Sequence, residues 1–256
     1  MLHTGLCSVT FRKHATDELI DLARKGGIEG IEWGGDVHVP PGDLENARVV
    51  GEKTAAAGLS VCSYGSYYRC DEESGSPAEV LETADALGAP IIRVWAGRQD
   101  SETATTEYRA EVVECLRRIV IAAQEFDITI ALEYHGKTFT DTQESAHKLL
   151  EEVGLPGLRL FWQPRTGGVF ENDLVELEAA LPHLAHVHCF NWGPEGRKDA
   201  RPLLDGAAQW HQFLDIVCKI EGDRFVILEF VKDDAPEQFI EDAKVLRSLI
   251  NGPAKS

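Results

Sequence analysis

The segment Ile128–His135 reads ITIALEYH, a run of mostly apolar residues that ends in Glu, Tyr and His. Its length is typical of a β-strand, and the stretch before it, about 107–126, repeats apolar residues at helical spacing. A short apolar strand that alternates with an amphipathic helix is the unit of a parallel α/β fold. If the fold belongs to this class, the same unit should recur along the chain.

Eight segments of this kind occur, each followed by turn residues and a longer amphipathic stretch. They are Leu2–Val9, Ile28–Trp33, Leu59–Tyr64, Pro90–Ala96, Ile128–His135, Leu158–Gln163, Leu184–Asn191 and Phe225–Val231. Alternating strands and helices form parallel sheets, and eight repeats without a change in composition favour closure into a barrel. A doubly wound sheet is the weaker alternative because the chain has no GxGxxG motif. We therefore predict an α/β fold, a single (β/α)8 TIM barrel that spans residues 1–256 as one domain.

The 256 residues contain 25 Lys and Arg against 43 Asp and Glu, which gives a formal net charge of −18. An acidic surface repels phosphate backbones and anionic lipid, so the composition argues against nucleic-acid and membrane partners. No apolar run approaches the ~18 residues of a membrane span, and residues 1–11 lack the layout of a signal peptide. The six cysteines have no CxxC spacing and are expected to be reduced thiols. These features predict a cytoplasmic protein.

Polar side chains stand at the carboxyl ends of four consecutive predicted strands, where the active sites of such barrels lie. They are Glu133 and His135 on the fifth strand, Gln163 on the sixth, His188 on the seventh and Glu229 on the eighth. One such residue alone is usually solvated, ion-paired or hydrogen-bonded in the core, but four coincident strand ends favour a shared metal or substrate site. A divalent cation is the simplest common partner for two carboxylates, an amide oxygen and an imidazole.

Four tryptophans also lie at or near the carboxyl ends of predicted strands: Trp33, Trp95, Trp162 and Trp192. They are equally consistent with packing at the barrel mouth and with an apolar wall against the face of a sugar ring. The sequence leaves both roles open.

At these residues the chain resembles the xylose isomerase-like TIM-barrel family of sugar isomerases and epimerases. The resemblance covers essentially the whole chain, and its most telling parts are 30–33, 91–97, 132–135, 186–188 and 227–230. Members of this family hold one divalent metal ion with Glu, Asp, His and Glu from the last four strands. The resemblance implies that Glu133, His188 and Glu229 are metal ligands and that Gln163 occupies the aspartate position.

Three positions depart from the family's pattern. Gln163 removes one negative charge from the ligand set; its amide would either bind the cation more weakly or donate a hydrogen bond to the substrate. Thr166 and Pro194 stand where the epimerase branch has His and Arg, which argues against ketose 3-epimerase chemistry in its best-known form. Metal-dependent abasic-site endonucleases share the barrel, but the net charge and the few histidines in the first half of the chain argue against DNA repair.

The resemblance implies a divalent-metal-dependent isomerase or epimerase of a small sugar or sugar-derived ketone. The cation would polarise a carbonyl group, and the catalytic residues Glu133 and Glu229 would remove and return the proton on the neighbouring carbon. His188 would bind the cation as a neutral imidazole, with its other nitrogen held by an acceptor. Mn²⁺, Mg²⁺ or Co²⁺ suits this ligand set best, and Zn²⁺ also fits.

Five residues are predicted to bind the substrate: His38, Arg93, Trp95, His135 and Arg201. For His38 the alternative is an exposed loop residue, and for Arg201 an ion pair with Asp199 or Asp205. Two other functions remain open, a metal-dependent lyase or dehydratase on an inositol- or sugar-acid-like ketone and a non-catalytic sugar-binding barrel with a decayed metal site. The resemblance is also consistent with a homo-oligomer, and the sequence does not specify the substrate.

Overall fold

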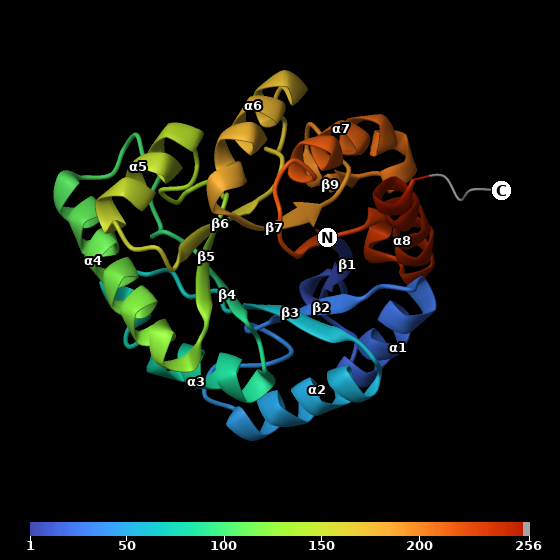
Figure 1. The fold of residues 1–256 in the computed structure, drawn as a ribbon, viewed down its shortest axis with the longest axis horizontal. Coiled ribbons are helices and arrows are strands. Elements are labelled where there is room, and N and C mark those ends of the chain that lie inside the picture. Colours follow the sequence, from blue (N-terminus) through green and yellow to red (C-terminus); the bar gives the residue numbers. More distant parts are fainter. Residues whose placement is uncertain (253–256) are drawn as a thin grey trace.

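The computed structural model describes residues 1–252 and shows eight parallel strands that close into a barrel (Figure 1). The strands follow the order β1-β10-β7-β6-β5-β4-β3-β2 around the barrel. Their bounds are β1 Leu2–Cys7, β2 Gly30–Gly34, β3 Ser60–Gly65, β4 Ile91–Val94, β5 Thr129–Glu133, β6 Leu158–Trp162, β7 Leu184–Cys189 and β10 Arg224–Leu228. The predicted (β/α)8 barrel is confirmed for these residues, and positions 253–256 of the predicted domain lie outside the described part.

Helices surround the barrel and connect its neighbouring strands (Figure 1). Their bounds are α1 Thr16–Gly26, α2 Leu44–Ala56, α3 Ala78–Leu87, α4 Thr106–Ala123, α5 Gln143–Val153, α6 Phe170–Ala180, α7 Ala207–Val217 and α8 Pro236–Asn251. Local sequence fixes several starts, since Asp43, Thr105 and Thr142 each accept a hydrogen bond from the backbone N–H three residues later. The right-handed crossovers expected for parallel strands are thus made by helices.

Six of the eight barrel strands end earlier than the sequence predicted, and β2 and β3 end one residue later. β5 ends at Glu133 instead of His135, and β10 ends at Leu228 instead of Val231. The polar residues that follow, including Glu229, belong to the loops that form the mouth of the barrel. The apolar runs therefore predicted the strands correctly. The polar residues at their carboxyl ends belong to the barrel mouth and not to the strands.

Two apolar layers hold the strands in place. The larger layer lies between the strands and the helices, and a smaller one fills the barrel interior with residues such as Ala131, Phe161 and Ile227. Gly5 is required by this interior packing, because a Cβ atom there would lie 2.8 Å from Cγ1 of Ile227. The filled interior makes the barrel a packed core rather than a channel.

A short antiparallel hairpin follows β7, where the sequence predicted only a long loop. It consists of β8, Trp192–Gly193, and β9, Gly196–Ala200. The backbone N–H of Arg201 donates to the carbonyl of Asn191 at 2.8 Å, which closes the base of the hairpin. The hairpin therefore holds Trp192 in a fixed position at the barrel mouth.

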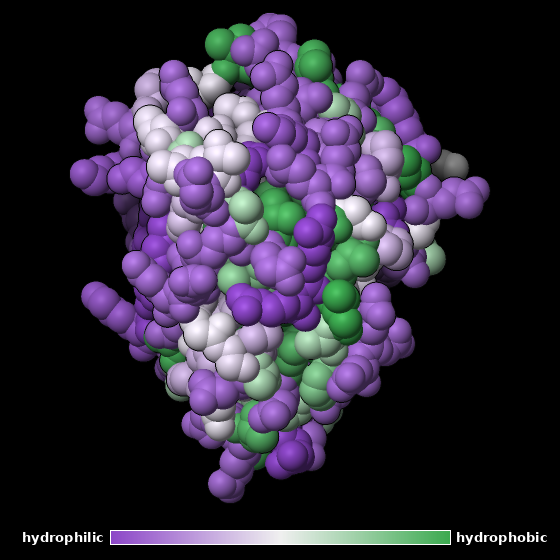
Figure 2. Space-filling view, turned by 90° about the vertical axis from the view of Figure 1, so that its left-hand side faces the viewer, coloured by the Kyte–Doolittle hydropathy of each residue, from purple (hydrophilic) through white to green (hydrophobic). Residues whose placement is uncertain are grey.

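The face of the molecule that carries α4 and α5 is mostly hydrophilic, and its apolar side chains show in a band near the middle of the view (Figure 2). None of the helices within residues 1–252 combines the length and the apolar character that a membrane span requires. The six cysteines are all free; five are buried and Cys218 is exposed.

Candidate active site

A cavity of about 510 Å³ opens at the carboxyl ends of the strands, and we call it the metal cavity. Six of the predicted site residues line it: Arg93, Trp95, Glu133, His135, Gln163 and Glu229. They belong to β4, β5 and the residues that directly follow β4, β5, β6 and β10. His188, at the end of β7, is fully buried beside them.

The four predicted metal ligands meet around His188. Its Nδ1 lies 3.0 Å from Oε1 of Gln163, 3.5 Å from Oε2 of Glu229 and 3.7 Å from Oε1 of Glu133. Neighbouring parallel strands end at one rim of the barrel, which is why residues nearly a hundred positions apart come together here. The arrangement brings three oxygens to within 3.7 Å of one nitrogen at the barrel mouth.

The amide of Gln163 has a defined orientation. Its Nε2 donates to the carbonyl of Tyr134 at 2.7 Å, so its Oε1 faces His188. An amide that presents its oxygen to the cluster fits the role of metal ligand better than that of a donor to the substrate.

Glu32, at β2, is a site residue that the sequence analysis missed. It is fully buried and accepts hydrogen bonds from four side chains: Cys7 Sγ at 3.1 Å, Ser63 Oγ at 2.7 Å, Arg93 Nε at 3.0 Å and His188 Nε2 at 3.3 Å. An ionised carboxylate only accepts, so Nε2 of His188 donates to Glu32, and Nδ1 is the nitrogen that faces the other three predicted ligands. Glu32 therefore fits the role of the acceptor that the sequence required for His188. Its only signal was a carboxylate within an apolar strand.

Arg93 lies between two carboxylates and is 2% exposed. Its Nε and Nη2 contact Glu32 at 3.0 and 2.9 Å, and its Nη1 donates to Oε2 of Glu133. Trp95 Nε1 donates to the same oxygen, which leaves Oε1 of Glu133 to face the cluster. Burial raises the pKa of Glu133, but Arg93, His188, His135 and Trp95 together lower it by more. Arg93 lines the cavity as predicted, yet all three of its nitrogens contact protein carboxylates instead of being free for a substrate.

The buried charges of the cluster do not cancel. Glu32, Glu133 and Glu229 carry three negative charges against the one positive charge of Arg93, so two remain when His188 is neutral. Burial raises the pKa of Glu229, and the nearby Glu133 adds to the rise. Burial lowers the pKa of His188, but Glu229 and Glu32 raise it by more. Both raised pKa values favour the protonated forms of Glu229 and His188, which reduce the uncompensated negative charge of the cluster.

This donor set fits a divalent cation. The two uncompensated negative charges match the charge of the ion, and a mixed set of imidazole, amide and carboxylate suits Mg²⁺ or Mn²⁺. Cys7, His188 and Glu229 also offer ligand atoms within 4.8 Å of one another. However, burial raises the pKa of the Cys7 thiol well above its usual value, and the thiol donates to Glu32. Cys7 is therefore the weakest candidate ligand of this group, and Glu133, whose Oε1 lies 3.7 Å from Nδ1 of His188, lies outside the group.

An aromatic wall flanks the cluster. The rings of Trp95 and His135 lie 4.6 Å apart, and Nδ1 of His135 donates to the carbonyl of Gly136 at 2.6 Å, which leaves Nε2 available. Tyr67 also lines the cavity, and its hydroxyl accepts a hydrogen bond from Arg12 at 3.0 Å. Tyr67 has a φ of +60°, in the left-handed region, and no pattern in the sequence pointed to it.

His38 does not line the metal cavity. It is 7% exposed, its Nδ1 lies 2.9 Å from Oγ of Ser8, and its ring packs against Trp33 at 5.9 Å. It is therefore neither placed against a substrate in this cavity nor an exposed loop residue. Of the four tryptophans predicted at strand ends, Trp33 and Trp162 are fully buried, and Trp95 and Trp192 line a cavity.

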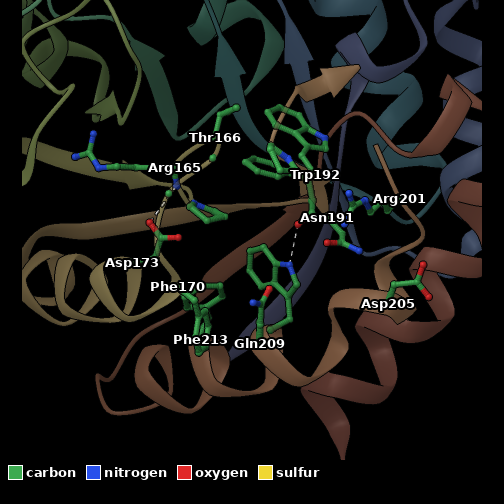
Figure 3. Close-up of a pocket in the computed structure, with 17 residues that line it drawn as sticks. Arg165, Thr166, Phe170, Asp173, Asn191, Trp192, Arg201, Asp205, Gln209 and Phe213 are labelled. Carbon is green, nitrogen blue, oxygen red and sulfur yellow. Dashed lines mark hydrogen bonds between the residues drawn. The ribbon is translucent and has the colours of Figure 1, made fainter. Parts of the chain in front are cut away.

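A second cavity of about 420 Å³ adjoins the first, and we call it the distal cavity (Figure 3). Four residues line both cavities: Pro164, Arg165, Thr166 and Trp192. Figure 3 shows Arg165 on one side of the distal cavity and Arg201 on the opposite side. Arg201 forms an ion pair with Asp199 at 2.7 Å, the alternative noted for it, and lies outside the lining of the metal cavity. Thr166 and Pro194, two of the departures from the family's pattern, both line the distal cavity.

Comparison with known proteins gives one curated relative and several similar structures. A 3-dehydroshikimate dehydratase of Bacillus anthracis is 22% identical over 274 aligned residues, which cover 94% of this chain and 95% of that protein. The crystal structure of a probable 3-DHS dehydratase of Bacillus anthracis has a TM-score of 0.82 and 21% identity, with 96% and 98% of the two chains covered. Such similarity to solved structures shows the fold.

Two other structures resemble the chain less closely. A xylose isomerase-like TIM-barrel protein of Mycobacterium smegmatis in complex with magnesium has a TM-score of 0.71 and 15% identity over 97% of both chains. A D-allulose 3-epimerase of Methylomonas sp. has a TM-score of 0.69 and 16% identity over 97% and 98% of the two chains. The model of the family described as xylose isomerase-like TIM barrel matches residues 20–249. The chain therefore belongs to the xylose isomerase-like TIM barrel family.

Proposed function

We propose that this chain is a divalent-metal-dependent enzyme that removes the proton next to the carbonyl group of a small polyhydroxylated substrate. The observation that carries the proposal is the convergence of oxygens from Glu133, Gln163 and Glu229 within 3.7 Å of Nδ1 of His188. A bound divalent cation would polarise the carbonyl and make the neighbouring carbon more acidic. The oriented amide oxygen of Gln163 favours an intact metal site over a decayed one.

The two carboxylates have different roles in this proposal. Glu133 is held through Oε2 by Arg93 and Trp95, so it serves as a fixed ligand. Glu229 has no Lys or Arg partner within the described residues; its oxygens lie near His188 at 3.5 Å and Cys7 at 3.9 Å. Glu229 is therefore the group that turns to the substrate and accepts its proton.

One free base favours elimination over epimerisation. An epimerase returns the proton from the opposite face, which requires a second carboxylate that is free to move. In an elimination, Glu229 takes the proton, the electrons of the carbon–hydrogen bond form a carbon–carbon double bond, and the β-hydroxyl leaves with that proton as water. The Bacillus anthracis dehydratase, similar over 94% of this chain, supports this reaction, a lyase reaction on a polyhydroxylated ketone.

Isomerisation is the second candidate, because it also works with one base. Glu229 would return the proton to the adjacent carbon on the same face, which moves the carbonyl group without loss of water. The wall formed by Trp95 and His135 supports this candidate, because it offers a flat apolar surface and a ring nitrogen to an open-chain sugar. The fate of the β-hydroxyl distinguishes the two reactions.

The test combines deuterium exchange with product analysis. The Mg²⁺- or Mn²⁺-loaded protein is incubated in D₂O with 3-dehydroshikimate, D-fructose and D-allulose, and NMR follows exchange of the carbon-bound hydrogen. Ultraviolet absorbance of a new conjugated carbonyl indicates the lyase. A shift of the carbonyl group to the adjacent carbon without water loss indicates the isomerase, and interconversion of the two ketoses would indicate an epimerase. Glu229→Gln should slow exchange by about 10²–10⁴-fold. Glu241→Gln, an exposed carboxylate paired with Lys244 on α8, is the matched control and should not.

Exchange that is unchanged in Glu229→Gln would exclude Glu229 as the base. A protein that binds neither cation would exclude the metal-dependent reaction itself.

A further inference from the structure

The distal cavity lies beside the metal cavity, and the proposed reaction does not use it. The two meet where Thr166, in the loop after β6, faces the hairpin β8–β9. A Cβ atom at Gly196 would lie 2.8 Å from Cγ2 of Thr166, so this loop and the hairpin are in contact. A small side chain, Thr166, and the indole of Trp192 thus border the junction of the cavities.

Trp192 is a fixed edge between the cavities. Its ring stacks on Phe190 with the centroids 3.7 Å apart and the planes at 13°, and its Nε1 donates to the carbonyl of Phe230 at 3.2 Å. Because both the ring and its nitrogen are held, Trp192 presents a rigid apolar group where the two cavities meet.

The lining of the distal cavity suits a polyhydroxylated ring. Phe170 and Phe213 lie together at one end in Figure 3, with their rings 5.2 Å apart. Gln209 and Asp205 approach from the α7 side, and within the described residues neither side chain has a hydrogen bond or ion pair. Nη2 of Arg165 is buried without a partner. Aromatic rings with a few free donors and acceptors are the usual lining for a sugar.

The charges of this cavity argue against a phosphate or carboxylate ligand. Nε of Arg165 contacts both oxygens of Glu176, at 2.7 and 2.8 Å, and Arg201 is paired with Asp199. Asp205 adds an unpaired negative charge to the lining. An anion would need a cation that the protein has not already neutralised, so a neutral group is the better match.

We infer that the distal cavity binds a neutral, sugar-sized group of a two-part substrate whose reacting part lies in the metal cavity. This inference rests on the proposed function of the metal cavity and adds the class of substrate, two linked polyhydroxylated rings. The second ring lies against Trp192 and the aromatic end of the cavity, and Gln209, Asp205 and Arg201 bind its hydroxyl groups. A monosaccharide that supplies only the reacting ring occupies the metal cavity and does not contact these residues, so they add nothing to its affinity.

The test measures binding and does not depend on turnover. Isothermal titration of the Mg²⁺-loaded protein compares D-glucose and D-glucose 6-phosphate with cellobiose, maltose, lactose and trehalose. At least one disaccharide should bind 10-fold or more tightly than D-glucose, and the phosphate should give no such gain. Thr166→Trp, which fills the junction, should remove the gain.

Two exposed glutamines on α7 give a matched pair of variants. Gln209→Ala should reduce the disaccharide gain at least 3-fold, whereas Gln212→Ala, which lines neither cavity, should keep it. This pair decides the question if Thr166→Trp fails to fold. Equal affinities for D-glucose and all four disaccharides would overturn the inference, as would a gain that both Thr166→Trp and Gln209→Ala retain. The gain should persist in Glu229→Gln, so failure of the proposed reaction is distinguishable from failure of this inference.

Discussion

The buried carboxylates on the two sides of the barrel mouth have different partners. We call Glu32, Arg93 and Glu133 the paired side, and Gln163, His188 and Glu229 the open side. On the paired side one guanidinium contacts both carboxylates and fixes their positions. On the open side the described residues supply no cation except a protonated imidazole. Each buried carboxylate of the paired side therefore contacts a guanidinium, whereas Glu229 on the open side contacts an imidazole.

This difference explains how the proposed fixed ligand, Glu133, and the proposed mobile base, Glu229, can lie at one barrel mouth. A buried carboxylate with two strong donors cannot leave them without a large free-energy cost. A buried carboxylate that faces only an imidazole can exchange that contact for a metal ion or for the proton of a substrate. The predictions that follow test this contrast, from the largest expected effect to the smallest.

Removal of the Arg93 guanidinium should destabilise the protein through the paired side. Arg93→Met leaves Glu32 and Glu133 buried without a counter-ion, so the free energy of unfolding of the metal-free protein should fall by about 3–5 kcal/mol. Urea denaturation measures the change. The control is Arg197→Met, which removes an exposed ion pair with Asp234 and should cost less than about 1 kcal/mol. Equal losses in the two variants would show that Arg93 compensates nothing.

The same charge removed from each side should have unequal effects on stability. Glu133→Gln takes a partner from Arg93 and should destabilise the metal-free protein by about 3 kcal/mol. Glu229→Gln removes a carboxylate whose charge is opposed by burial and should change the free energy of unfolding by less than about 1 kcal/mol. Denaturation of both variants at one pH compares them directly. A larger loss in Glu229→Gln would reverse the contrast between the two sides.

Metal binding should stabilise the protein through the open side. Mg²⁺ or Mn²⁺ at 100 times its dissociation constant should raise the free energy of unfolding by about 2.7 kcal/mol, and a chelator should reverse the rise. The rise should shrink in Glu229→Gln at the same ion concentration and persist in the control Glu241→Gln. Thermal unfolding with and without the ion provides the measurement, and an equal rise in both variants would place the ion elsewhere.

Asp173, which lines the distal cavity, is another buried carboxylate without a basic side-chain partner within residues 1–252, and the expected effect on stability is smaller. Burial raises its pKa to about 6, although its carboxylate accepts a hydrogen bond from the backbone N–H of Arg165. A raised pKa means that the stability it contributes is full at low pH and is lost as the pH rises through about 6. Relative to Asp173→Asn, the native protein should therefore lose about 1–2 kcal/mol between pH 4 and pH 7. Urea denaturation across this range should show no divergence if Asp173 has an ordinary pKa.

Most of the architecture could be predicted from the sequence. Eight apolar runs alternated with amphipathic stretches, and the requirement to bury both determined a barrel with its polar strand ends at one rim. That rim is why Glu133, His188 and Glu229 could be grouped before any coordinates were known. Covalent order and strand polarity are sufficient for such an inference, because neighbouring parallel strands end side by side.

Contacts across the barrel could not be predicted in this way. Glu32 reaches His188 from the opposite side of the barrel, 156 residues away in sequence, and nothing in its own strand indicated that partner. Arg93 was expected to hold a substrate, but a guanidinium between two buried carboxylates is held by them. For His38, the path of its loop decided the contact with Ser8.

The sequence by itself determined the fold class, the family and the polar side chains at the ends of the last four strands, because these depend on local periodicity and on the order of elements. Only the tertiary structure decided which carboxylate is paired, which way the Gln163 amide points and where the second cavity opens. Those outcomes depend on distances of about 3 Å between residues from different strands and loops, and such distances follow from how the barrel closes and packs.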